Sequence, residues 1–378
     1  MKNSFLTILL FIFSFGAIGA QELALVREDN KFGYINKQGA YVIEPRFKKA
    51  STFFDGVASV LENKKWGYIL PDGTWLLEPQ FIKAKRFDNG VAMVIKDKEW
   101  IYIDKKGNRL DYCDGEKLFP FNQGVAFIRS NGLIGLINSN GDVIVAPKYK
   151  VIRRFRNGFA KFADQNDKWG IINIHGNVII KPEYVTIGNY VNGVAIAEKK
   201  KNVKGLVSSN NFIELEGVSE IADFKIGGKY TAAKKKGKVG FIDSDGKWFI
   251  EPQYLKAESF SNGYAGVFDN GRWGFIDETG KLVIDFIFGD VNYFSKDGLV
   301  AVRNTKWGVA NKEGEIIIPQ KYDLASSDFS FQFGSAGDIG FLNGIIRVKY
   351  KNKWGFFTST GELLAGKWFK NAEIFSKN

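Results

Sequence analysis

The sequence has almost no cysteine or histidine, with Cys113 and His175 the single representatives among 378 residues. One cysteine excludes an intramolecular disulfide. One histidine excludes Ser-His-Asp and Cys-His catalysis unless the two single residues happen to meet, and the pair is too few for a zinc site. Cys113 falls where other copies of a repeated pattern carry proline, and His175 lies in a turn-like stretch, NIHGN. We interpret both as structural and expect no catalytic residue, no metal site and no cofactor.

Long apolar runs are also absent once the N-terminus is set aside. Lys2, the apolar run FLTILLFIFSF and the small residues GAIGA follow one another ahead of Gln21. This order is typical of a secretory signal peptide cleaved after Ala20, with an uncleaved N-terminal anchor as the alternative. No cysteine stands at the cleavage point, which argues against an acylated lipoprotein. We expect residues 1–20 to be a signal peptide and residues 21–378 to be exported without a transmembrane segment, to the periplasm, the cell surface or the medium.

Glycine, in contrast, is plentiful and periodic. A Trp-Gly pair or its equivalent returns every 34 or 35 residues, until a last step of 47. The residues that precede this first glycine, called anchor residues below, are Phe32, Trp66, Trp100, Ile134, Trp169, Lys204, Val239, Trp273, Trp307 and Trp354. A second glycine follows six residues after the first in most copies, and a third follows 23 or 24 residues after the first. Ten repeats therefore fill residues 21–378, degenerate near 199–240 and with an insertion near 323–343.

Each unit reads as three short strands and a connector. In GVASVLE, Ala58 and Val60 alternate with other residues, as in a strand with one buried face. A polar tip leads to the WGYI strand, and a glycine turn, which supplies positive φ, leads to a third strand such as YVIEP. Pro45 and Pro79 are expected to end that third strand, because proline donates no ladder hydrogen bond. The pattern predicts an all-β protein made of three-stranded antiparallel meanders.

The anchor tryptophans are interpreted as core rings packed between successive meanders, each burying on the order of 200 Å². The neighbouring glycine would remove a Cβ where another backbone or ring approaches closely. The alternative is an exposed ladder of tryptophans that stacks on sugars or bases. Phe32, Ile134 and Val239 at the same position favour the core interpretation, since an exposed platform would tolerate Ile and Val poorly.

The tripeptide KWG, followed by GK or GE turns and EP strand ends, resembles the family of WG-containing (KWG) repeat proteins. It stands at Lys65-Trp66-Gly67, Lys168-Trp169-Gly170, Lys306-Trp307-Gly308 and Lys353-Trp354-Gly355. The resemblance covers essentially all of residues 21–378, although the sixth and seventh copies depart from it with Lys204-Gly205 and Val239-Gly240. It implies a bacterial, frequently exported, repetitive β protein. The family brings no shared active site, so no catalytic residue is carried over.

Two overall arrangements are compatible with these units. The chain starts in a first strand (LALVRED) and ends in a connector, so in a closed β-propeller the first strand could complete the last blade. An open, solenoid-like array fits the same units. Since ten units exceed the roughly four to eight blades of most propellers, we expect the open array and keep the propeller as the alternative.

Positive charge is the remaining clue to function. The chain has 53 basic and 41 acidic residues, a formal net charge of +12. Lysines gather at two successive tips between first and second strands, EKKKNVKG and KKKGKVG. The candidate polyanion-binding residues are Lys199, Lys200, Lys201, Lys204, Lys234, Lys235, Lys236 and Lys238. The alternative is a solvated hairpin edge on which lysines discourage strand pairing.

These observations favour an exported, non-enzymatic scaffold that binds an envelope protein or a glycan, the usual role of repeat arrays. Binding of acidic glycan or lipid headgroups through the lysines is a second possibility. A hydrolase is the weakest option, because no acidic pair is placed out of step with the repeat. Export and the assignment of the aromatic residues to cores argue against nucleic acid as a partner. The identity of the partner and the oligomeric state are left open.

Overall fold

The computed structural model describes residues 22–112, 116–209, 211–323, 341–342 and 344–376. The expected signal peptide, Cys113 and most of the insertion lie outside the described residues. Within them the fold is all-β: ten small antiparallel sheets follow one another along the chain. The tandem array of about ten meander units, expected from the periodicity of the sequence, is thereby confirmed.

Each unit supplies a first and a second strand, all but the last add a third, and most connectors add a short fourth strand. The first strands are β1 (Ala24–Glu28), β5 (Ala58–Glu62), β9 (Ala92–Lys96), β12 (Val125–Ser130), β16 (Phe159–Ala163), β20 (Ala195–Lys200), β24 (Thr231–Lys235), β28 (Tyr264–Asp269), β32 (Val300–Arg303) and β36 (Ile345–Tyr350). The second strands are β2 (Lys31–Ile35), β6 (Lys65–Ile69), β10 (Glu99–Ile103), β13 (Leu133–Asn138), β17 (Trp169–Asn173), β21 (Val203–Val207), β25 (Lys238–Ile242), β29 (Arg272–Asp277), β33 (Trp307–Ala310) and β37 (Lys353–Thr358).

The third strands are β3 (Tyr41–Phe47), β7 (Trp75–Phe81), β11 (Arg109–Leu110), β14 (Val143–Tyr149), β18 (Val178–Tyr184), β22 (Phe212–Glu214), β26 (Trp248–Tyr254), β30 (Leu282–Phe288) and β34 (Ile316–Tyr322). The short connector strands are β4 (Lys49–Ala50), β8 (Lys83–Ala84), β15 (Val151–Ile152), β19 (Thr186–Ile187), β23 (Val218–Ile221), β27 (Lys256–Ala257), β31 (Asp290–Val291), β35 (Phe341–Leu342) and β38 (Asn371–Ala372). A 3-10 turn, η2 (Leu364–Gly366), follows β37. None of the helices in the described part of the chain is long and apolar enough to cross a membrane.

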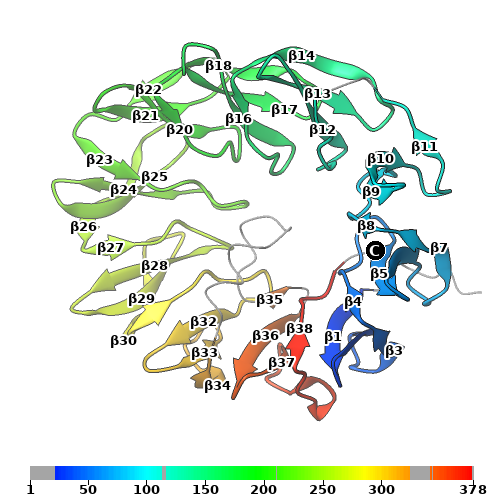
Figure 1. Ribbon diagram of the computed structural model, residues 1–378. Coiled ribbons are helices and arrows are strands. Elements are labelled where there is room, and N and C mark those ends of the chain that lie inside the picture. The colour runs from blue at the N-terminus through cyan, green and yellow to red at the C-terminus, as the bar shows by residue number, and fades with distance from the viewer. Residues whose placement is uncertain (1–21, 113–115, 210, 324–340, 343, 377–378) are drawn as a thin grey trace, which may run out of the picture.

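The sheets stand around a ring, and each connector strand pairs with the first strand of the following unit (Figure 1). First strands such as β16 and β28 lie nearer the middle of the ring, and third strands such as β18 and β30 lie at the rim (Figure 1).

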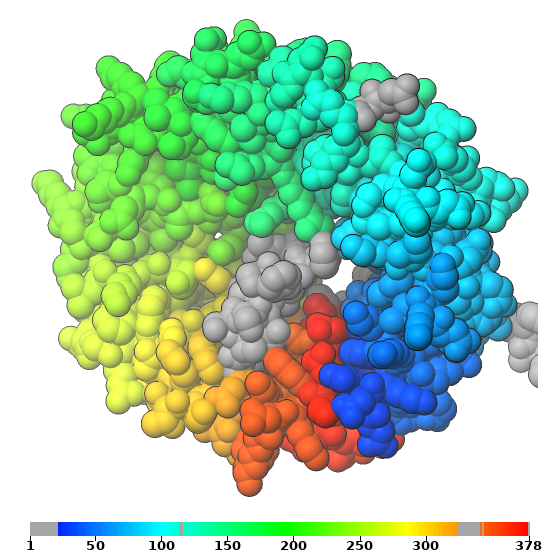
Figure 2. Space-filling model, in the orientation of Figure 1, coloured from blue at the N-terminus to red at the C-terminus, as the bar shows by residue number. Residues whose placement is uncertain are grey.

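The two ends of the chain meet in one sheet. The C-terminal β38 pairs with β1, so the last connector completes the first unit. The amide of Glu373 donates to the carbonyl of Leu25 at 2.8 Å, and the amide of Ser376 to that of Leu23 at 3.0 Å. Figure 2 shows the N-terminal and C-terminal residues packed against each other in a continuous ring. Of the two arrangements that the sequence left open, this pairing is the one expected of the closed propeller; an open array, with its end units apart, does not account for it.

Turn chemistry explains the hairpins. The tip between first and second strands takes two residues with positive φ, as at Asn63 (48°) and Lys64 (65°). The turn before each first strand is of the same kind: Asp55 and Gly56 have φ of 53° and 79°, and Phe54 and Val57 exchange backbone hydrogen bonds. Two-residue turns with both φ values positive match the twist of paired strands, and Asn, Asp and Gly adopt them most readily.

The glycine after the anchor residue is required by a bulge in the third strand. Trp66 pairs with Phe81 and Tyr68 pairs with Leu77, so one residue of β6 stands opposite three of β7. A Cβ on Gly67 would lie 2.7 Å from the carbonyl oxygen of Leu77. The close backbone approach expected from the sequence is therefore present.

The same bulge corrects the role expected for proline. Pro79 lies within β7, which continues to Phe81, so it does not end the strand. Proline is tolerated there because the bulged residues take no part in the ladder and β7 is the outermost strand of its sheet. A bulge, a proline and a charged residue at this outer edge also discourage pairing with other chains.

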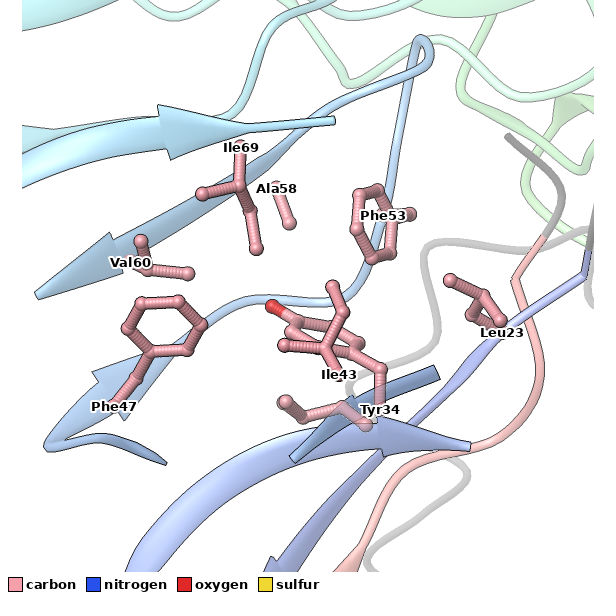
Figure 3. Close-up of a cluster of buried hydrophobic side chains, with 9 residues drawn as sticks. Leu23, Tyr34, Ile43, Phe47, Phe53, Ala58, Val60 and Ile69 are labelled. Atoms are coloured by element: carbon pink, nitrogen blue, oxygen red, sulfur yellow. The ribbon is translucent and has the colours of Figure 1, made fainter. Parts of the chain in front are cut away.

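The core lies between successive sheets, and its largest rings are not the anchor tryptophans. In the first interface, Tyr34 of one unit faces Phe53 of the connector that follows, with ring centroids 4.7 Å apart (Figure 3). The same pairing recurs at Tyr68–Phe87 (4.7 Å), Tyr102–Phe121 (5.4 Å), Phe241–Phe260 (4.9 Å), Phe275–Phe294 (5.0 Å) and Phe356–Phe375 (5.2 Å). These rings stand two positions after the anchor residue and three before the third glycine or its equivalent.

The anchor tryptophans are more exposed than expected. Trp66 and Trp169 are half-buried, and Trp100 is 36% exposed. Trp273 alone among the anchor tryptophans is buried. They stand opposite the far end of the third strand, towards the rim, where the neighbouring sheet covers them incompletely. The interpretation of these rings as fully buried core is therefore wrong for most copies. The first strand differs as well: Ala58, Ser59 and Val60 are all buried, because this inner strand is covered on both faces rather than one.

Candidate functional site

The lysine tips predicted from the sequence lie at the β20–β21 and β24–β25 hairpins. Lys199, Lys200, Lys201 and Lys236 are exposed, while Lys204, Lys234, Lys235 and Lys238 are half-buried. The two tips are linked through Ser219 of β23. Lys204 Nζ donates to the carbonyl of Ser219 at 2.6 Å, and Ser219 Oγ donates to the carbonyl of Lys234 at 3.2 Å. The expected side-by-side placement of neighbouring tips is therefore seen for Lys204 and Lys234.

Acidic and aromatic groups lie among these lysines. Lys234 forms an ion pair with Glu220 at 3.2 Å, and Lys199 Nζ lies 5.5 Å from the centre of the Phe212 ring. Glu198 accepts a hydrogen bond from the amide of Asn202 at the first tip. The surface is a mixed one in which lysines outnumber carboxylates.

His175 is an exposed turn residue whose amide donates to Asn173 Oδ1 at 3.0 Å. The described residues contain no group of three or more His, Cys, Asp or Glu side chains placed to hold a metal ion.

A cavity that the sequence reasoning missed lies among three successive connectors. Its volume is about 570 Å³, within the range of roughly 300–1,000 Å³ typical of small-molecule sites. It is lined by residues 153, 154, 156, 157, 189–191 and 223–226, with Phe159, Ala160 and Lys161 of β16 and Ile171 of β17. None of the tip lysines is among these lining residues, so the cavity is separate from the hairpin tips.

Four of the cations that line the cavity come from one connector and its strand: Arg153, Arg154, Arg156 and Lys161. Among the described residues, neither Arg156 nor Lys161 has an ion-pair partner. Arg153 lies over the Trp169 ring at 5.5 Å. Partial burial and the neighbouring charge of Arg156 lower the pKa of the Arg154 guanidinium, and Asp88 acts in the opposite direction. The guanidinium groups of Arg154 and Arg156 are thus close enough to interact electrostatically.

The third of the three connectors contributes one carboxylate to the cavity, Asp223. Asn189 Nδ2 donates to Asp223 Oδ2 at 2.9 Å. The carboxylate takes this position because residue 188 is glycine: a Cβ on Gly188 would lie 2.5 Å from Asp223 Oδ1. Lys225 lines the same side, but its ammonium lies 4.1 Å from the centre of the Tyr293 ring, and burial lowers its pKa against the opposing effects of Glu258 and Asp223.

Two aromatic rings lie between the cationic side and Asp223. Phe159 and Tyr190 meet at a centroid distance of 4.7 Å, and both line the cavity. Burial raises the pKa of the Tyr190 phenol, which therefore stays neutral. The cavity thus combines cations, an acceptor of hydrogen bonds and an apolar surface.

The run RRFR at residues 153–156 was the available signal for this cavity. Equivalent connectors read STFF at 51–54 and KRFD at 85–88, so this one is unusually basic. The sequence could not show that it faces Asp223, because the two segments lie about two repeats apart.

Several carboxylates elsewhere are bound to turn backbone. Asp72 and Asp277 each accept from the amide and the hydroxyl of the threonine two residues later, and these bonds hold the pKa of both carboxyl groups below the ordinary value. Other carboxylates join successive units: Asp55 accepts from the amide of Gly90, and Asp88 accepts from the amides of Gln123 and Gly124. These four carboxylates therefore have a structural role in the turns and between the units.

Comparison with known proteins identifies the repeat. The family described as "WG containing repeat" matches residues 32–66, 66–100, 134–169, 169–202, 240–273, 273–305 and 307–354. Two longer stretches between the matches are left unmatched, 101–133 and 203–239, and the second lies within the units that the sequence marks as degenerate. No curated protein matches the sequence.

Solved structures resemble the chain only distantly. A structure titled "eukaryotic initiation factor" has 11% identity and a TM-score of 0.44, covering 79% of this chain and 95% of that one. Apo AztD from Citrobacter koseri has 10% identity and a TM-score of 0.32, covering 94% and 98%. BamB from Moraxella catarrhalis has 10% identity and a TM-score of 0.29, covering 77% and 92%.

Proposed function

The chain belongs to the family of WG-containing repeat proteins, and on this basis we propose that it is an exported, non-enzymatic scaffold that binds a protein or a glycan at the bacterial cell envelope. Export follows from the signal peptide expected over residues 1–20. A binding role follows from the repetition of one small sheet, which presents equivalent strand edges and turns in succession.

The observation that carries this proposal is the structural use of the acidic side chains. A general acid or base needs a pKa near the working pH, yet the turn carboxyl groups of Asp72 and Asp277 are shifted downward by their threonine partners. Asp55 and Asp88 are occupied by the amides of the next unit. These groups stabilise the repeat and are poorly suited to proton transfer.

A pull-down from the cell envelope with residues 21–378 as bait tests the proposal. We expect a specific envelope protein or glycan to be retained, and no turnover of a panel of polysaccharide, phosphoester and peptide substrates. Turnover of any substrate by the purified protein would overturn the assignment as a non-enzymatic scaffold. Detection of the chain exclusively in the cytoplasmic fraction would overturn export.

Binding of polyanions through the lysine tips is the second candidate. The observation in its favour is Ser219, which holds Lys204 and Lys234 beside one another. Four exposed lysines extend this surface into solvent, where they can attract an acidic glycan or an anionic lipid headgroup.

Retention on heparin tests this second candidate. It should weaken steeply with salt, because exposed charges are screened beyond about 10 Å at 0.1 M ionic strength. Replacing Lys199, Lys200 and Lys201 by serine should reduce retention far more than replacing Lys83, Lys181 and Lys247, which are exposed on other parts of the ring. Equal loss from the two sets would mean that net charge alone drives retention.

A further inference from the structure

Two cationic side chains that line the cavity between the connectors form no ion pair with any residue that the structure describes. These are Arg156 and Lys161. Arg156 is held in place through its backbone, since its amide donates to the carbonyl of Phe159 at 2.8 Å within the turn. Its guanidinium is exposed and offers a planar set of donors suited to a carboxylate or a phosphate.

The other side of the cavity limits which anion fits. Asp223 accepts one hydrogen bond from Asn189, which leaves acceptor positions on an ionised carboxylate. A negative charge there disfavours a ligand that is anionic on every side, such as inorganic phosphate. It favours a ligand that carries hydroxyl donors some distance from its anionic group.

The aromatic rings add a third requirement. Phe159 and Tyr190 give the cavity an apolar surface between the cations and Asp223. A sugar ring has an apolar C–H face, and its hydroxyl groups project from its edge. An acidic sugar therefore meets all three requirements. Its carboxylate can bind Arg156 and Lys161, its hydroxyl groups can donate to Asp223, and its apolar face can pack against the two aromatic rings.

We propose that this cavity binds an acidic sugar, as a free uronic acid or as a residue of an acidic glycan, with its carboxylate on Arg156 and Lys161 and its hydroxyls on Asp223. This deepens the proposed scaffold function by naming a ligand class and a site away from the lysine tips.

Calorimetric titration of the purified protein with glucuronate, glucose and inorganic phosphate at 0.15 M salt tests the site. We expect glucuronate to bind and both other probes to bind at least tenfold more weakly. An oligosaccharide of alternating uronic acid should bind more tightly than free glucuronate if a glycan is the natural source, and equally if the free acid is. Absence of measurable glucuronate binding, or equal affinity for glucose, would overturn the proposal.

Single substitutions sharpen the test. Arg156→Gln should weaken glucuronate binding at least tenfold, and Lys161→Gln should act in the same direction. Lys181→Gln is the matched control, because Lys181 is exposed on β18 of the same sheet and the change in net charge is identical. Equal effects of Arg156→Gln and Lys181→Gln would show that overall charge, and not the cavity, attracts the ligand.

Asp223→Asn separates a sugar from a simple anion. The substitution removes the negative charge at nearly constant shape, so glucuronate should bind more weakly and phosphate more tightly. Tighter binding of glucuronate to this variant would contradict the role of Asp223 as an acceptor for hydroxyls. Failure in these titrations would not affect the envelope pull-down, so the site and the scaffold function are tested independently.

Discussion

Glycines at different positions of the repeat have separate structural causes. Residue 67 must be glycine because space is lacking: the bulge of β7 would bring the Leu77 carbonyl oxygen within 2.7 Å of a Cβ at this position. Gly90 has nothing within 4 Å of such a Cβ, and its requirement is the positive φ of 82°. Two glycines that look alike in the repeat therefore have different reasons: close packing for the first and turn geometry for the second.

The buried aromatic pair, and not the anchor tryptophan, should contribute most to stability. Phe87→Ala should destabilise the protein by about 3–5 kcal/mol, as truncation of a fully buried ring does. Trp169→Ala should cost less than this range, because Trp169 is half-buried and packs against the edge of its cluster. Urea denaturation of the two variants measures the difference. A larger loss for Trp169→Ala would restore the interpretation of the tryptophans as the core.

The buried tyrosines predict an alkaline limit to stability. Burial raises the pKa of Tyr34 and Tyr68 far above the ordinary value, while each hydroxyl donates to a backbone carbonyl, of Ser51 at 2.7 Å and of Lys85 at 2.6 Å. Unfolded tyrosine ionises near pH 10, so the unfolded state binds fewer protons above that pH. The contribution is complete below about pH 10 and is lost as the pH rises above it.

The change in unfolding free energy between pH 9 and pH 11 checks this expectation. A Tyr34→Phe/Tyr68→Phe variant should lose less stability over that interval than the unchanged protein, although it lacks two hydrogen bonds. Identical losses would mean that other groups, such as the many lysines, control the alkaline transition.

At the scale of elements, the turns before the first strands are linked from one unit to the next. Asp55 reaches the amide of Gly90 at 2.6 Å, Asp88 reaches that of Gly124 at 2.7 Å, and Gln123 Oε1 reaches that of Gly158 at 2.9 Å. The residues of these pairs are 35 or 36 positions apart, close to the repeat length, so in these three units a side chain satisfies a donor in the following one. Such bonds set the angle between sheets in addition to the apolar core.

Removal of one such link should destabilise the ring. Asp88 is 2% exposed, binds two amides and also meets Arg86 at 3.5 Å. Asp88→Ala leaves buried donors unsatisfied and should cost at least about 2 kcal/mol. Asp111→Ala is the control, since that carboxylate forms an exposed ion pair with Arg109, for which about 0–1 kcal/mol is usual. Equal effects in thermal denaturation would argue against a structural role for the linked turns.

At the scale of the whole molecule, the joint between the chain ends resembles the joints within the chain. Ala24, Val26 and Ile35 of the first unit share a buried cluster with Phe356 and Phe375 of the last. Equivalent clusters occur between successive units, as between Tyr68 and Phe87. Closure therefore uses the ordinary packing of the repeat, with β38 as the connector strand that pairs with β1.

Truncation after Phe369 tests the importance of closure. It removes β38 and Phe375 and leaves the inner edge of β1 unpaired, so we expect lower thermal stability and association between chains through that edge. Light scattering and a thermal melt measure both effects, with a chain ending at Ser376 as the control. A monomer of unchanged stability would show that the ring does not depend on its terminal pairing.

The cavity shows where a periodic sequence stops being informative about a site. Tip lysines form long visible runs, whereas Asp223 is a single residue and Arg156 ends the short run RRFR, each in a connector of ordinary length. Their meeting depends on the angle between successive sheets. That angle follows from packing across Tyr190 and Phe159 and from the Asn189–Asp223 hydrogen bond, and neither can be read from spacing.

The sequence alone determined the repeat, its strands and its turns, because those depend on local chemistry. Glycine at positive φ, alternating apolar residues and a fixed period specify each meander without reference to distant residues. Tertiary structure decided which ring is buried, why Pro79 sits inside a strand, that β38 pairs with β1 and where the cationic cavity lies. Each of these depends on contacts between units, and the free energy of such contacts comes from surfaces that exist only after the sheets have packed against one another.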